Sequence, residues 1–130
     1  MSSTHLRPSE RTRPFVAVVC AVPLLGEAVR SALEFADVQT FAARSGDLDG
    51  LVRWLQPDVL IVEDEADATE AEAFARDHGL PVLHVSVRDP VLRLCRRGEW
   101  EHIGNGDAPT PELIRNVVAG ALFARAGVAT

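Results

Sequence analysis

The 130-residue chain contains no lysine, so all thirteen of its permanently cationic side chains are arginines. A site that depends on a lysine ammonium group is therefore excluded. Basic residues are also outnumbered, since the formal net charge is −6, and aromatic residues make up only 5% of the chain. Because phosphate binding requires a basic face, this balance argues against direct nucleic-acid binding.

Long apolar runs are absent as well. No run approaches the roughly 20 residues that a membrane-spanning helix requires. Residues 1–14 carry arginines but no apolar core, so they do not read as a signal peptide. With 47% hydrophobic and 25% charged residues, the composition is that of an ordinary globular protein. We expect a cytoplasmic protein without membrane contact.

Cysteine is scarce and histidine is scattered. Cys20 and Cys95 are the only cysteines, and neither has a metal-spaced partner, so we expect two free thiols. The histidines at positions 5, 78, 84 and 102 form no zinc pattern. Residues 20–26 lack the Gly-x-Gly-x-x-Gly turn of a dinucleotide site, and no P-loop occurs. We therefore expect no metal and no cofactor.

Short apolar runs and helical patterns alternate after Pro14, which is typical of an α/β fold. Residues 1–13 show no periodicity, and we predict a disordered tail followed by one domain over residues 14–130. The expected strands lie at residues 15–21, 38–42, 57–62, 80–87 and 100–103. The expected helices lie at residues 23–33, 48–55 and 66–78, with a short one from Pro90 and a last one from Pro111.

Prolines mark two of these helix starts with a capping residue in front of them. Asp89-Pro90 and Thr110-Pro111 each combine an N-cap with a proline suited to the first helical position. Five strand–helix units in about 115 residues predict a flavodoxin-like doubly wound fold. Its five-stranded parallel sheet has the strand order 2-1-3-4-5, with helices on both faces.

Three stretches carry a family resemblance. They are Pro23 to Val29 at the first helix, Pro57 to Val62 at the third strand, and Asp107 to Leu113 running into Ala119-Gly120 at the last helix. In this order and spacing they resemble bacterial response-regulator receiver domains, over residues 15 to about 123. The nearest kind is the receiver that precedes a helix-turn-helix output domain. The resemblance implies two-component signalling.

The resemblance also implies where a phosphorylation pocket belongs, and this sequence has lost most of it. Receivers hold Mg²⁺ with an acidic pair after the first strand, phosphorylate an aspartate after the third, and use a hydroxyl and a lysine after the fourth and fifth. The matching positions here are Cys20 and Ala21, Glu63, Ser86, and Gly106 or Asn105. Because Mg²⁺ requires oxygen ligands, a thiol and a methyl group cannot replace its carboxylates. We expect no phosphotransfer.

Glu63 leaves two questions open. Asp64 follows it directly and becomes the acceptor if the third strand is shifted by one residue, although such a slip turns the side chain to the other face. Glu63 itself either mimics a phosphorylated aspartate through its permanent charge or is a solvated carboxylate left after the site decayed.

Arginines gather after the fourth strand. Arg88, Arg93, Arg96, Arg97 and Trp100 are expected on and beside the helix from Pro90. In receivers, the face formed by this helix, the fifth strand and the last helix is the usual dimer and output surface. Arginine and tryptophan are enriched at interface hot spots, so we expect this face to bind a partner.

The sequence predicts a stand-alone pseudo-receiver, a module without enzymatic activity that regulates bacterial signalling or transcription by phosphorylation-independent protein interaction. A protein partner is expected, with a homodimer through the arginine face as one form of it. The alternative is a small-molecule sensor that uses the degenerate pocket formed by Glu63, Asp64, Cys20, Ala21, Ser86 and Gly106.

Overall fold

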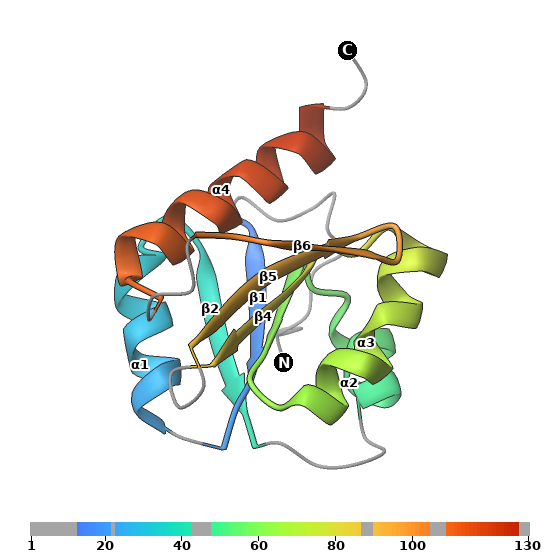
Figure 1. Cartoon of the computed structure of the whole chain (residues 1–130), viewed down its shortest axis with the longest axis horizontal. Helices are drawn as coiled ribbons and strands as arrows, with labels where there is room; N and C mark the ends of the chain where they lie inside the picture. The colour runs from blue at the N-terminus through green and yellow to red at the C-terminus, as the bar shows by residue number, and fades with distance from the viewer. Residues whose placement is uncertain (1–12, 22, 43–47, 87–89, 105–108, 128–130) are drawn as a thin grey trace, which may run out of the picture.

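A computed structural model of the chain describes residues 13–21, 23–42, 48–86, 90–104 and 109–127. The described residues form a six-stranded sheet flanked by four helices (Figure 1). The elements are β1 (Phe15–Val19), α1 (Pro23–Ala32), β2 (Asp37–Phe41), α2 (Leu48–Leu55), β3 (Val59–Val62), α3 (Glu65–His78), β4 (Val82–Ser86), β5 (Val91–Arg96), β6 (Glu99–His102) and α4 (Pro111–Gly127). No helix among these residues is long and apolar enough to cross a membrane.

The strand order across the sheet is β2-β1-β3-β4-β5-β6. The first four strands in this order are parallel, whereas β5 and β6 run antiparallel to their neighbours. Every residue of β1 and β3 is buried, which explains why both strands are continuous apolar runs in the sequence.

The predicted helix from Pro90 is wrong, because residues 91–96 form strand β5. Their alternation has a period of two: Leu92 and Leu94 are buried against α1 and α4, while Cys95 faces the other core. Pro90 lies in a turn, a position that proline suits as well as a helix start, and Asp89 lies outside the described residues.

The predicted five-stranded parallel sheet is wrong in consequence. The strand expected at residues 100–103 exists as β6, but it pairs antiparallel with β5 and not with β4. Arg97 and Gly98 connect the two strands, and both have positive φ angles, 55° and 86°. Two such residues form the tight turn whose twist matches that of a hairpin. The sheet is therefore mixed and one strand wider than predicted.

Helices cover both faces of the sheet, as predicted. Figure 1 shows α1 and α4 on one side and α2 and α3 on the other. Each pair encloses its own apolar core against the sheet. Because side chains alternate along each strand, neighbouring residues of β4 enter different cores: Leu83 and Val85 face α1 and α4, whereas Val82 faces α2 and α3.

The helix ends follow the local sequence. The Leu113 amide donates a hydrogen bond to Thr110 Oγ1 at 3.1 Å, which confirms the predicted cap of α4. Gly79 ends α3 in the left-handed conformation, with φ 67°. Glycine is the residue most common in this conformation at a helix end. Residues 1–12 of the predicted disordered tail lie outside the described residues. The last residue of that predicted tail, Arg13, is described, and its Nη1 lies 3.4 Å from Asp37 Oδ1.

Candidate functional site

The carboxyl ends of β1 and β3 bring three of the predicted pocket residues together. Val19 is paired with Val62 in the parallel ladder, and the Glu63 amide donates to the Val19 carbonyl at 3.1 Å. Cys20 and Ala21 follow β1, so they lie beside Glu63 at the same edge of the sheet. This is the edge at which open α/β sheets place their ligand chemistry.

The Glu63 carboxylate is engaged by the backbone. Its Oε1 accepts a hydrogen bond from the amide of Ala21 at 2.9 Å, which ties the residue after β3 to the turn after β1. The Glu63 side chain is half-buried. This bond holds the carboxylate at the position where the resemblance places a phosphoacceptor.

Cys20 offers no ligand for a hard cation. Its side chain is buried, and burial together with the negative charge of Glu63 raises the pKa of the thiol. The group therefore stays protonated at neutral pH, and a neutral thiol does not hold Mg²⁺. Among the residues that the structure describes, no group of three or more His, Cys, Asp and Glu side chains could hold a metal ion.

The other predicted pocket residues are placed differently. Asp64 is exposed at the N-cap of α3, in an extended conformation with φ −83° and ψ 140°, and its side chain makes no capping bond. Ser86 ends β4 half-buried and is paired with Val91 of β5. Gly106 and Asn105, the candidates for the lysine position, lie outside the described residues.

The predicted arginine face is divided by the hairpin. Arg96 and Arg97 are exposed at the hairpin tip, and Arg88 lies outside the described residues. Arg93 and Trp100 point toward α3, where they contact Glu65 and Glu72. The Arg93 side chain is only 18% exposed, so the prediction that it lies free on a helix surface is wrong. Strand alternation places Arg93 and Arg96 on opposite faces of β5.

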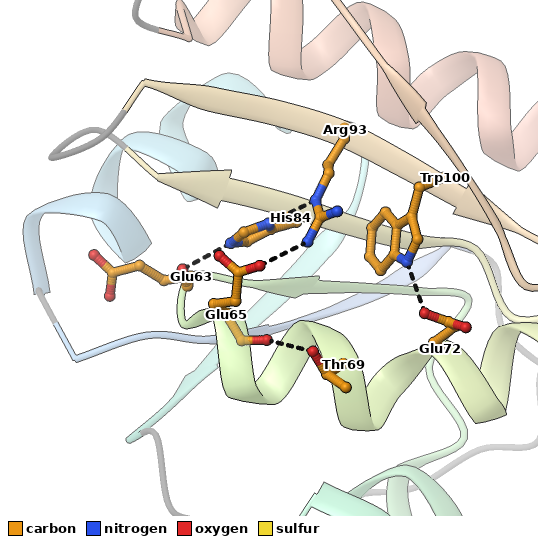
Figure 2. A network of polar contacts seen from close by, with 7 residues as sticks. All are labelled: Glu63, Glu65, Thr69, Glu72, His84, Arg93 and Trp100. Atoms are coloured by element: carbon orange, nitrogen blue, oxygen red, sulfur yellow. Dashed lines mark hydrogen bonds and ion pairs between the residues drawn. The ribbon is translucent and has the colours of Figure 1, made fainter.

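Arg93 belongs to a network that the sequence did not reveal (Figure 2). Its Nε donates to His84 Nδ1 at 3.0 Å, its Nη2 lies 3.6 Å from Glu65 Oε2, and its Cζ lies 4.2 Å from the ring centre of Trp100. Trp100 Nε1 donates to Glu72 Oε1 at 3.0 Å. The network joins β4, β5 and β6 to the first two turns of α3.

His84 occupies the centre of this network and is 3% exposed. Its Nε2 lies 3.1 Å from the carbonyl oxygen of Glu63, and its ring meets that of Trp100 edge-on at 6.4 Å. Burial, followed by the charge of Arg93, lowers the pKa of the imidazole. One sequence signal could have found it: His84 is the one ionisable residue within the apolar strand at residues 82–86.

A groove of about 520 Å³ lies beside the ends of β1 and β2. Val19, Phe41, Leu51 and Trp54 are among its lining residues. The lining contains none of the residues predicted for a small-molecule pocket, so the groove lies next to the predicted site and not in it.

Comparisons with known proteins show the fold. No family model matches the chain, and no curated protein matches its sequence. The crystal structure of the anti-anti-sigma factor PhyR from Bartonella quintana is similar, with a TM-score of 0.60 and 14% identity, over 93% of this chain and 52% of that one. The chain thus spans about half the length of that protein. It has a receiver-like α/β fold.

Proposed function

We propose that this chain is a regulatory protein-interaction module whose state is not set by phosphorylation and which catalyses no reaction. The observation that carries the proposal is the hydrogen bond from the Ala21 amide to Glu63 Oε1, at 2.9 Å. The bond holds the Glu63 carboxylate where the resemblance expects the phosphoacceptor, and its donor is a residue at one of the expected metal positions.

The chemistry of the strand ends supports this proposal. Phosphotransfer to a carboxylate in a receiver requires a divalent cation that bridges the acceptor and the incoming phosphoryl group. Here the neighbouring side chains are a buried neutral thiol, Cys20, and the methyl group of Ala21. Neither can supply the oxygen ligands that Mg²⁺ demands.

Incubation with acetyl phosphate and Mg²⁺ tests the phosphorylation claim. We expect the intact mass to remain unchanged, in the wild type and in Asp64→Asn alike. A stoichiometric adduct of one phosphoryl group that disappears in Asp64→Asn contradicts the proposal, and so does a micromolar Mg²⁺ site by calorimetry that is lost in Glu63→Gln.

The tip of the β5–β6 hairpin is the interaction surface that we propose. Arg96 and Arg97 are exposed there, and within the described residues neither side chain makes an ion pair or a hydrogen bond. Arg76 of α3 lies against the same turn, since a Cβ added at Gly98 would lie 3.2 Å from the Arg76 Cβ. Guanidinium groups pair bidentately with carboxylates, which suits an acidic protein surface. The similarity to an anti-anti-sigma factor is consistent with a protein partner.

Charge reversal at the tip tests this surface. Arg96→Glu with Arg97→Glu is expected to weaken self-association or partner capture, without loss of the circular dichroism signal. Arg53→Glu is the control for charge reversal at another surface, because Arg53 is also exposed but lies on α2, where it pairs with Asp49. Light scattering and pull-downs measure both. If the wild type is monomeric at high micromolar concentration and its captured partners are unaffected, the hairpin tip is not the working surface.

A further inference from the structure

A buried histidine links the end of β3 to the β5–β6 hairpin. His84 extends from β4 into the layer between the sheet and α3, where it is 3% exposed. Both ring nitrogens have partners: Nε2 meets the Glu63 carbonyl oxygen at 3.1 Å, and Nδ1 meets Arg93 Nε at 3.0 Å (Figure 2). The imidazole therefore spans from the candidate site to the strand that carries Arg93.

These two partners fix the protonation state of the ring. Arg93 Nε carries a hydrogen and can only donate, so His84 Nδ1 must accept with its lone pair. A carbonyl oxygen can only accept, so Nε2 carries the single ring proton and donates it to Glu63. The network as described requires a neutral His84.

A second proton has no place in this arrangement. It would have to bind Nδ1, where the Arg93 N–H already points, and it would set an imidazolium against a guanidinium in a buried layer. The Arg93–His84 hydrogen bond must then break and the two cations must separate.

The charged and titratable groups around His84 come from β5, β6 and α3. Arg93 faces it from β5, and Arg93 is itself paired in the ladder with His102 of β6. Asp64 and Glu65, at the start of α3, favour the protonated ring, while burial and Arg93 oppose it. Glu72 acts only through Trp100, whose indole N–H it accepts at 3.0 Å.

We propose that His84 and Arg93 form a proton-sensitive latch, in which protonation of His84 Nδ1 releases Arg93 and with it the β5–β6 hairpin from α3. The proton comes from solvent, and the bonds that change are the hydrogen bonds and contacts of Arg93. Released Arg93 leaves the carboxylate of Glu65 and the ring of Trp100. The hairpin thereby loses one of its two polar attachments to α3 and keeps only the hydrogen bond from Trp100 to Glu72. The inference does not depend on the proposed function.

The direction with pH follows from the lowered pKa of His84. A histidine free of these contacts titrates near its ordinary value of about 6.5, whereas the latched ring resists protonation. The latch is therefore at full strength above about pH 6.5 and weakens as the pH falls below that value. For one proton, the ratio of latched to released molecules falls by up to about tenfold per pH unit.

Trp100 fluorescence reads out the latch in a Trp54→Phe background. Trp54 is 70% exposed and is the only other tryptophan, so its replacement leaves Trp100 as the single reporter. Between pH 7.5 and pH 5 we expect a reversible one-proton change in emission while far-ultraviolet circular dichroism stays constant. NMR of the imidazole nitrogens is expected to show the Nε2-protonated neutral ring at pH 7.5 and the imidazolium at the low-pH end.

Three variants separate the latch from other effects. His84→Gln keeps a donor and an acceptor but cannot titrate, so the transition is expected to vanish. Arg93→Gln removes the opposing cation, so the His84 imidazole is expected to titrate at higher pH by NMR, which tests the latch even if His84→Gln does not fold. His102→Gln removes an exposed histidine and is expected to leave the transition unchanged.

Two results overturn the proposal. One is a transition that persists in His84→Gln or disappears in His102→Gln, because the titrating group is then not His84. The other is a Trp100 signal that changes only together with global loss of circular dichroism, because the hairpin is then not released on its own.

Discussion

Glu63 connects two strand ends through one side chain. Its carboxylate accepts a hydrogen bond from the amide of Ala21 at 2.9 Å, a bond that an alanine cannot replace and a glutamine can. We expect Glu63→Ala to lower the free energy of unfolding by about 1 kcal/mol and Glu63→Gln to lower it much less. Urea denaturation at pH 7 measures both variants. Equal stability of the two variants would mean that this bond contributes nothing in solution.

Asp67 has a less favourable environment, because one oxygen of its buried carboxylate has no hydrogen-bond partner. The residue is 4% exposed in the first turn of α3, and its Oδ2 has no hydrogen-bond partner. Burial, with the nearby charges of Asp64 and Glu70, raises the pKa of the carboxyl group above its ordinary value of 3.8. We expect Asp67→Asn to raise the free energy of unfolding at pH 7 by about 1 kcal/mol.

The pH dependence of that gain has a definite sign. A carboxyl group with a raised folded pKa takes up its proton more readily in the folded state, so the wild type recovers stability as the pH falls toward 4. The advantage of Asp67→Asn is therefore expected to shrink in acid. Thermal unfolding at pH 7 and pH 4.5 measures it, with Glu112→Gln, an exposed carboxylate in the first turn of α4, as the control. A gain that is equal at both pH values would show that the Asp67 charge is not the cause.

At the scale of elements, the β5–β6 hairpin contains a residue that its turn does not favour. Arg97 has φ 55°, a left-handed conformation that costs a side chain with a Cβ roughly 1 kcal/mol. Asparagine tolerates it better, so Arg97→Asn is expected to stabilise the protein by about 0.5–1 kcal/mol. Arg96→Asn is the control, because Arg96 lies in the strand. If both substitutions have the same effect, charge and not backbone conformation is responsible.

Close packing of α1 on β2 depends on a glycine. A Cβ at Gly26 would lie 2.6 Å from Thr40 Cγ2, whereas nothing lies within 4 Å of a Cβ at Gly50 or Gly120. We expect Gly26→Ala to destabilise the protein by about 1–2 kcal/mol in spite of its better helix propensity. Gly50→Ala and Gly120→Ala are expected to stabilise it by up to about 1 kcal/mol. Chemical denaturation compares the three, and a stabilising Gly26→Ala would contradict the described contact.

At the scale of the whole molecule, protection against unfolding is expected to decrease from the sheet centre outward. Every residue of β1 and β3 is buried, while β6 is an edge strand with three of its four residues exposed. Amide hydrogen exchange at pH 7 is expected to be slowest in β1 and β3 and fastest in β6. Protection of β6 equal to that of β1 would argue against independent release of the hairpin.

Most elements were predictable because local sequence and burial agree. The runs at β1 and β3, the amphipathic pattern of α2, the cap at Thr110 and the terminating Gly79 each indicate one conformation. The segment at residues 91–96 was misassigned because Asp89-Pro90 suggested a helix start. Leu92 and Leu94 on one face, with Arg93 between them on the other, follow the period of a strand. The turn between β5 and β6 was not predicted, because arginine is not a residue expected at the positive φ that Arg97 adopts there.

The sequence by itself determined the α/β class, the apolar runs that form the two cores, the absence of lysine and the absence of a carboxylate at residues 20 and 21. These properties follow from composition and periodicity, which act locally. Only the tertiary structure decided that Arg93 turns inward, that β5 runs antiparallel, and that His84 lies between Glu63 and Arg93. Those outcomes depend on strand register, because pairing His84 with Arg93 across two antiparallel strands brings together groups that nothing in their local sequences connects.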